Sequence, residues 1–201
     1  MRVFISPSVQ TRNLYAIEGK PSEHEICQKI GLACGAYLVN MGAEAFCYTG
    51  LSMTEAVKMS NAYNANYHVC IHTNADRSGK AHGAVTFCHH SRVNNNTVER
   101  VHRNLIALID NHNNDYKDDR GIKANDALYE IRKTKAICIY TETDFHSNPD
   151  CAEWIVENTA EIGRAIAFGI MNKEYNPFGN PLKYPEEVAK CKCGCRLEDC
   201  R

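Results

Sequence analysis

The fold is decided by the stretch Tyr67-His68-Val69-Cys70-Ile71-His72-Thr73-Asn74-Ala75. Residues 67–71 are mostly apolar, which predicts a buried strand, and short polar residues follow them. A second apolar stretch covers residues 136–140 and is followed by Glu142. Strands of this kind are typical of a parallel sheet that is covered on both faces.

Around these two stretches, short β-rich runs alternate with longer segments of helical periodicity, which is the pattern of an α/β protein. We predict a single three-layer domain with a mostly parallel sheet of about six strands flanked by helices. Ser22 with Glu25, and Ser52 with Glu55, have the spacing of a capping box and mark two helix starts. The predicted strands are residues 3–5, 45–48, 67–71, 83–88, 127–131 and 136–140, and the predicted helices begin at residues 22, 52, 97 and 149, the last one reaching about residue 171.

Composition limits the possible functions. The 201 residues include 44% hydrophobic and 23% charged residues, as expected for one globular domain with a short appendage. The formal net charge of −1 gives no reason to expect a nucleic-acid partner. Pro7 interrupts the first apolar run, and no long apolar stretch follows, so we expect neither a signal-peptide core nor a membrane span.

The eleven cysteines fall into two groups. Seven lie singly in apolar or helical segments, as buried free thiols do, and this favours synthesis in a reducing cytoplasm. The other four, Cys191, Cys193, Cys195 and Cys200, crowd the end of the chain. These four cysteines could bind a metal, although their spacing is tighter than that of zinc fingers. Disulfides formed after export and a simple linker are the alternatives. We therefore divide the chain into a catalytic domain, residues 1–172, and a cysteine-rich tail, residues 173–201.

Candidate site residues lie where strands end, because ligands of open parallel sheets bind beyond the carboxyl ends of the strands. His72 follows the strand at 67–71, although a hydrogen-bonded structural histidine would also fit there. His68 would lie about 13 Å away along an extended strand, too far to share one metal, and we predict a buried histidine. Glu142 follows a very apolar strand, where burial raises a carboxyl pKa, as suits a general base. Glu23 opens the first helix, a place that the helix dipole favours for any carboxylate.

Taken together, these residues have a familiar order. From residue 2 to about 172 the sequence resembles the zinc-dependent N-acetylmuramoyl-L-alanine amidases of the amidase 3 type. The resemblance rests on Ser22-Glu23, the stretch 67–75, Gly83, Asp119-Arg120-Gly121-Ile122-Lys123, and residues 136–148 with Glu142, Phe145 and Ser147-Asn148. It implies that Glu23 and His72 bind Zn²⁺ and that Glu142 is the catalytic base.

One part departs from the family pattern. The usual zinc-binding histidine after the first strand is missing, and Ser6-Pro7-Ser8 resembles a branch found among clostridial and phage endolysins and autolysins. Val9 takes the place of that histidine and cannot bind a metal. Gln10 is the provisional third ligand, although glutamine is unusual for zinc and can equally serve as a hydrogen-bonding loop residue. His24 is another candidate, but its helical position turns it toward a different face.

The resemblance implies a function. We expect hydrolysis of the amide between N-acetylmuramic acid and L-alanine in peptidoglycan, by a monomer that binds neither nucleic acid nor membrane. The alternatives are a zinc peptidase that cuts within the wall stem peptide and an inactive wall-binding protein. Loops 74–83 and 111–125 would set specificity, with Arg120 and Lys123 either meeting a stem-peptide carboxylate or facing solvent. A cytoplasmic protein of this kind reaches the wall by secretion or through a holin, and the sequence does not distinguish a phage from a bacterial origin.

Overall fold

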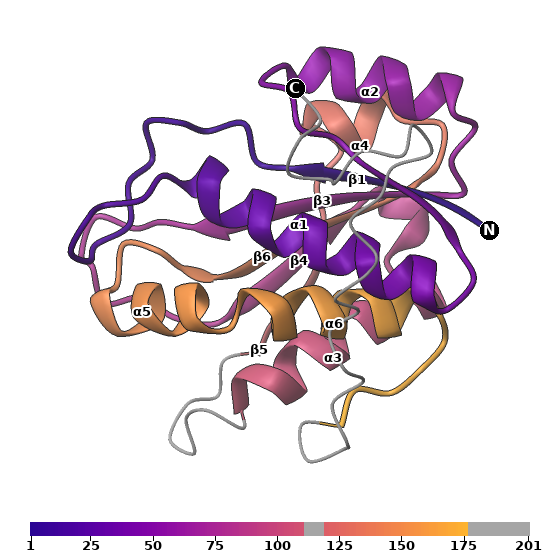
Figure 1. Cartoon of the computed structure of the whole chain (residues 1–201). Coiled ribbons are helices and arrows are strands. Elements are labelled where there is room, and N and C mark those ends of the chain that lie inside the picture. Colours follow the sequence, from indigo (N-terminus) through magenta and orange to yellow (C-terminus); the bar gives the residue numbers. More distant parts are fainter. Residues whose placement is uncertain (111–118, 177–201) are drawn as a thin grey trace.

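The computed structural model describes residues 1–110 and 119–176. These residues form one six-stranded sheet with the order β2-β1-β3-β6-β4-β5 (Figure 1). Every adjacent pair is parallel except β4 and β6, so the prediction of a mostly parallel sheet in an α/β domain is confirmed. The strands are β1 (Arg2–Pro7), β2 (Glu44–Cys47), β3 (Tyr67–Asn74), β4 (Ala84–Cys88), β5 (Asp119–Ala124) and β6 (Ile137–Phe145).

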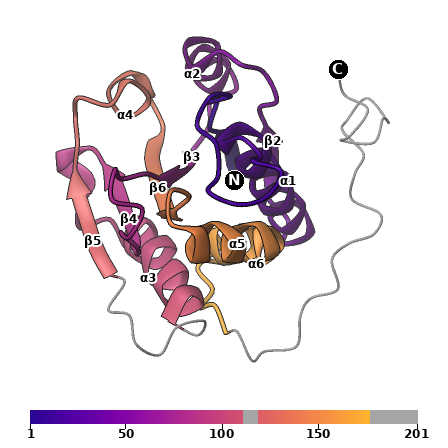
Figure 2. The same ribbon diagram turned by 90° about the vertical axis from the view of Figure 1, so that its left-hand side faces the viewer.

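Helices cover both faces of the sheet, which gives the three layers (Figures 1 and 2). Four of them pack on one face, and two, α2 and α4, lie on the other. The helices are α1 (Glu23–Asn40), α2 (Met53–Ala62), α3 (Asn96–Asp110), α4 (Tyr129–Lys133), α5 (Pro149–Glu157) and α6 (Thr159–Ile170), with a 3₁₀ turn at η1 (His90–Arg92).

The main hydrophobic core lies between the sheet and α1, α3 and α6. Because side chains alternate along a strand, Val69 and Ile71 of β3 point into this core, whereas Cys70 belongs to a smaller cluster under α4. Helices α1 and α6 approach closely at Gly163, where an added Cβ would lie 2.7 Å from the backbone nitrogen of Cys34. The opposite face of the sheet has smaller apolar clusters, and His68 and His72 of β3 point to it together with Cys70.

The two predicted capping boxes differ. At α1, Ser22 accepts from the Glu25 backbone and the Glu25 carboxylate accepts from the Ser22 backbone, so the box is complete. At α2, Ser52 accepts from Glu55, but the Glu55 carboxylate accepts from the Tyr48 hydroxyl instead. The second box is thus only half formed, because a tyrosine from the preceding strand end competes for the carboxylate.

Three predictions about elements were wrong. Residues 127–131 are not a strand, because residues 129–131 belong to helix α4. The sixth strand is β5, which lies within the predicted loop 111–125. The predicted helix 149–171 is two helices, since Asn158 has φ −110° and ψ 19° and interrupts it. Strands β3 and β6 continue past residues 71 and 140 because they pair with each other through His72 and Glu142.

Packing continues past the predicted end of the domain at residue 172. Tyr175 is buried against the main core, and its hydroxyl donates to Glu161 at 2.7 Å. The four cysteines of the tail, and residues 111–118 of the predicted specificity loop, lie outside the described residues. Within the described parts of the chain, no helix has the length and apolar character needed to span a membrane.

Candidate metal centre

Glu23 and His72 meet at the carboxyl end of the sheet. Glu23 is the first residue of α1, His72 lies near the end of β3, and Glu23 Oε1 is 2.9 Å from His72 Nδ1. Both side chains are buried, with relative exposures of 2% and 7%. Burial alone would raise the pKa of Glu23, but hydrogen bonds from His72, Asn13 and Ser8 bring it below its usual value. Burial alone would lower the pKa of His72. The hydrogen bond to Glu23 and the negative charge of Glu142 outweigh this effect, so the pKa of His72 lies above its usual value.

Asn13 fixes the second oxygen of Glu23. Its side-chain amide donates to Glu23 Oε2 at 2.9 Å, and its backbone carbonyl accepts from the Glu23 N–H at 2.7 Å. The Thr73 N–H lies 3.4 Å from Oε1, the oxygen that faces His72. The carboxylate is therefore oriented by the loop before α1 and by β3 together.

Glu142 stands beside His72 in the β3–β6 ladder, where the two residues are register partners. The residue is partly buried, and its Oε2 atom is buried with no hydrogen-bonding partner among the described residues. Burial raises the pKa of Glu142 to about 7; repulsion from Glu23 adds to this effect, and attraction to His72 opposes it. The Tyr140 ring stacks on the His72 imidazole with centroids 4.4 Å apart, which holds the imidazole in place.

A pocket of about 400 Å³ opens beside His72. Val9 and Gln10 line it on the side of β1, and Met53, Tyr140 and the start of α4 line the rest. The Gln10 backbone donates to Ser8 Oγ and accepts from the His24 N–H, while the His24 imidazole Nδ1 is 2.8 Å from the Ser8 carbonyl oxygen. Gln10 thus shares a pocket with His72, whereas His24 is engaged by the backbone of the loop.

Comparison with known proteins gives this geometry a context. Residues 4–172 match the family model described as N-acetylmuramoyl-L-alanine amidase. The chain belongs to this family. It is therefore a hydrolase of the peptidoglycan amidase class. No curated protein matches the sequence.

Three solved structures illustrate the shared fold. Cwp6 from Clostridium difficile has 22% identity and a TM-score of 0.73 over 86% of this chain, which corresponds to 29% of that chain. The N-acetylmuramoyl-L-alanine amidase AmiC2 of Nostoc punctiforme has 22% identity and a TM-score of 0.71, and 86% of this chain covers 96% of it. The catalytic domain of CwlV, an amidase from Bacillus (Paenibacillus) polymyxa var. colistinus, has 19% identity and a TM-score of 0.73 over 85% of this chain and 96% of that domain. Identities this low show a shared fold.

The amidase also contains a buried carboxylate that sequence reasoning missed. Glu130, at 3% exposure, accepts from the Ser6 hydroxyl at 2.6 Å and lies 3.1 Å from His68 Nε2. Burial alone would raise the pKa of Glu130, but the hydrogen bonds from His68 and Ser6 lower it. The sequence did not indicate that Glu130 would bond Ser6 and His68, because residues 127–131 were predicted as a strand. His68 is fully buried, as predicted.

Other polar groups of the amidase lie elsewhere. Arg120 is exposed, donates from Nε to the His82 carbonyl, and places its guanidinium 4.5 Å from the centre of the Phe145 ring.

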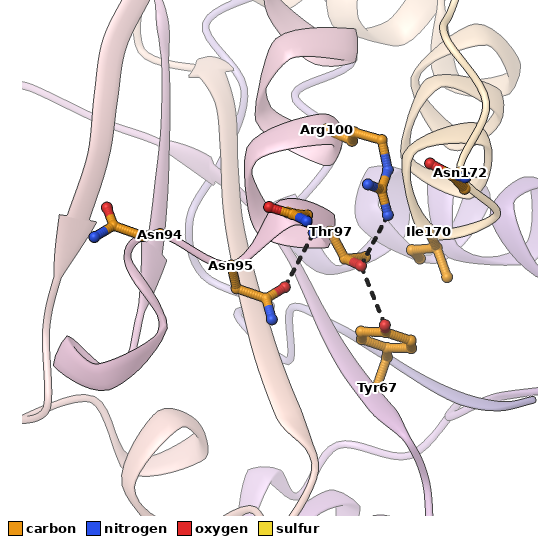
Figure 3. Close-up of a pocket in the computed structure, with 8 residues that line it drawn as sticks. Tyr67, Asn94, Asn95, Thr97, Arg100, Ile170 and Asn172 are labelled. Carbon is orange, nitrogen blue, oxygen red and sulfur yellow. Dashed lines mark hydrogen bonds between the residues drawn. The ribbon is translucent and has the colours of Figure 1, made fainter.

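A pocket of about 580 Å³ surrounds Thr97 and Arg100 (Figure 3). It lies near Tyr67, at the opposite end of β3 from His72, and its polar groups bond one another: Arg100 donates to Thr97, whose hydroxyl also contacts the Tyr67 hydroxyl. This pocket is therefore remote from the Glu23–His72 pair, and its polar groups satisfy one another.

Proposed function

We propose that the protein hydrolyses the amide between N-acetylmuramic acid and L-alanine in a zinc-dependent reaction, with Glu23 and His72 as zinc ligands and Glu142 as the base. One observation carries this proposal: a buried carboxylate–imidazole pair lies next to Glu142, whose Oε2 has no hydrogen-bonding partner in the part of the chain that the structure describes. Structural networks normally satisfy buried polar atoms, so a buried oxygen that bonds no other described residue favours a reacting group.

The donor atoms fit zinc. Carboxylate oxygen and imidazole nitrogen are common zinc ligands, and catalytic zinc sites hold three protein ligands and keep one position open. Gln10 is our proposal for the third ligand, because it lines the same pocket as His72 and its side-chain amide oxygen can donate a lone pair to a metal. Asn13 would keep Glu23 from rotating, as hydrogen-bond partners of metal ligands do.

When bound, zinc polarises the amide carbonyl and acidifies water. Glu142 performs the proton transfers: its carboxylate takes a proton from the attacking water and delivers it to the departing nitrogen, so that the amine leaves neutral. A pKa near 7 suits both steps, because the group is then neither too weak a base nor too weak an acid at neutral pH. Glu142 Oε2 bonds none of residues 1–110 and 119–176, so it can accept the water's hydrogen bond.

Purified cell walls test the proposal. The zinc-loaded protein should release new alanine amino termini, and EDTA should stop the release. Glu142→Gln should retain zinc and lower the rate about 10²- to 10⁴-fold, the usual contribution of a general base. Glu153→Gln, at an exposed position of α5, is the matched control and should keep full activity. Amino termini from inside the stem peptide would point to a stem peptidase instead, and binding without any release would point to an inactive wall-binding protein.

The remaining expectations belong to the same proposal. We propose peptidoglycan as the partner, a monomer as the acting form, and membership of the Ser6-Pro7-Ser8 branch of endolysins and autolysins. The protein would reach the wall by export or through a holin. Light scattering of the purified protein tests the monomer, because a dimer would give twice the mass of the 22.6 kDa chain.

A further inference from the structure

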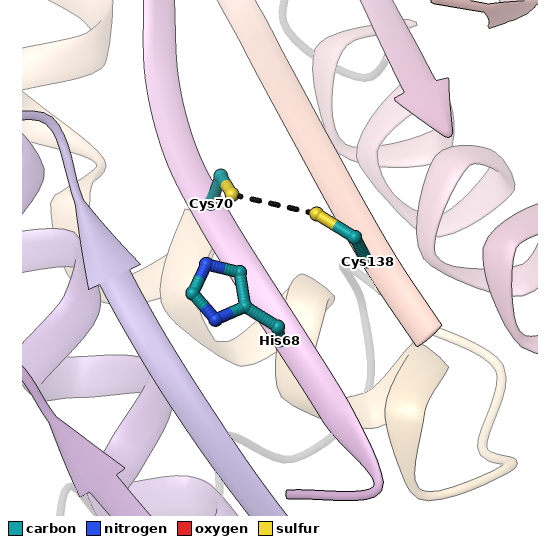
Figure 4. Close-up of side chains that lie close together, drawn as sticks. All are labelled: His68, Cys70 and Cys138. Carbon is teal, nitrogen blue, oxygen red and sulfur yellow. Dashed lines mark hydrogen bonds between the residues drawn. The ribbon is translucent and has the colours of Figure 1, made fainter. Parts of the chain in front are cut away.

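A second group of side chains of metal-binding type lies on the face of the sheet beneath α4. His68, Cys70 and Cys138 come from the neighbouring strands β3 and β6, and their ligand atoms all lie within 4.8 Å of one another (Figure 4). All three are buried, with relative exposures of 0%, 0% and 4%. His68 and Cys138 are register partners, and Cys70 lies on the same face two residues further along β3. The sheet itself therefore brings them together.

The spacing of the two thiols suits a shared metal ion. Cys70 Sγ and Cys138 Sγ are 3.7 Å apart. Two thiolates on a tetrahedral zinc ion, each with a bond of about 2.3 Å, lie about 3.8 Å apart. A disulfide needs about 2.05 Å, so forming one would require the sulfurs to move much closer together. A metal ion would fit with little movement of either strand.

We propose that His68, Cys70 and Cys138 form a second, structural zinc site. Glu130 Oε1, 3.1 Å from His68 Nε2, orients the imidazole, and this leaves His68 Nδ1, which has no hydrogen-bonding partner among the described residues, to bind the metal. Binding replaces the two thiol protons, which are released to solvent, by one Zn²⁺ ion. Two thiolates neutralise the charge of the ion, which limits the cost of burying it between β3 and β6.

This site is separate from the Glu23–His72 pair. His68 and His72 lie four residues apart on one strand, about 13 Å along it, so one ion cannot bind both. The zinc would join β3 to β6 below the positions of His72 and Glu142. If this second site does not bind zinc, the proposed amidase reaction is unaffected, because the two sites share no ligand.

Metal content and spectroscopy test the site. The full-length chain with Cys191, Cys193, Cys195 and Cys200 replaced by serine provides a background without tail thiols. We expect two zinc ions per chain in this background, and a sulfur-to-metal charge-transfer band after replacement by Co²⁺. Cys70→Ala/Cys138→Ala should lower the content to one ion and remove the band. Glu23→Gln/His72→Ala should also lower it to one ion but keep the band.

Cys34→Ala is the matched control, because Cys34 is an equally buried cysteine in the main core, and it should keep two ions and the band. If Cys70→Ala/Cys138→Ala does not fold, zinc-edge X-ray absorption of the background protein decides instead: two sulfur neighbours at about 2.3 Å support the site. A shell of nitrogen and oxygen only would overturn it. A band that survives Cys70→Ala/Cys138→Ala, or a Cys70–Cys138 disulfide found by mass spectrometry after anaerobic purification, would overturn it as well.

Discussion

Glu142→Gln should change how the stability of the metal-free protein depends on pH. Burial raises the pKa of Glu142 from 4.5 to about 7, so ionising this group is harder in the folded chain than in the unfolded one. Below pH 4.5 the carboxyl is protonated in both states and there is no penalty. As the pH rises toward 7 the unfolded state gains by losing a proton, and the folded state loses stability. At 1.36 kcal/mol per pKa unit, the full penalty above pH 7 is roughly 3 kcal/mol.

The assay is urea unfolding of chelator-treated wild type and Glu142→Gln at several pH values between 4.5 and 8. The neutral amide does not titrate, so the variant should gain about 3 kcal/mol relative to wild type across this range, whatever constant offset its packing adds. Glu153→Gln, on the exposed surface of α5, should show no such trend. A stability difference between wild type and Glu142→Gln that stays constant with pH would refute the raised pKa and with it the assignment of the base.

Three further changes test other contacts. Asn13→Ala should weaken zinc binding about 10- to 100-fold in a chelator competition, as loss of a ligand's hydrogen-bond partner does, while Asn61→Ala, whose amide bonds the distant Lys133 carbonyl, should not. Gly163→Ala should lower the free energy of unfolding by at least about 2 kcal/mol, because the new Cβ meets the α1 backbone; an unchanged urea midpoint would contradict this close packing. Asn104→Ala should lower it by about 2–3 kcal/mol, since the amide bonds the Ala165 and Lys173 carbonyls and the Tyr175 N–H; a loss below 0.5 kcal/mol by the same measurement would show that these bonds contribute little.

The sequence predicted the centre of the fold better than its edge. β3 and β6 were found because their apolar residues are buried on both faces, and the rule for parallel sheets brought His72 and Glu142 to one end. β5 was missed because its pattern is mostly polar: it is an edge strand paired only with β4, and little apolar burial marks it. The start of α4 was taken for a strand, because five residues are too short to show a helical period.

Polar partners were harder to predict than elements. Glu23 and His72 lie 49 residues apart, and it was the family resemblance that implied that they share one site. The bond of Glu130 to Ser6 spans 124 residues, and only the packing of α4 over the sheet creates it. Asn13 was likewise invisible, because a loop asparagine gives no sign of the carboxylate that it will bond.

In the proposed reaction, the pairing of His72 with Glu142 would separate the chemistry from the recognition of the wall. Both groups belong to the two middle strands of the sheet, so backbone hydrogen bonds set their spacing. The start of α4 lines the pocket beside His72, and the loop at residues 74–83 follows β3 at the same end of the sheet. Chimeras that take these outer segments from other wall hydrolases are therefore expected to exchange the range of susceptible bacteria while the reaction stays the same.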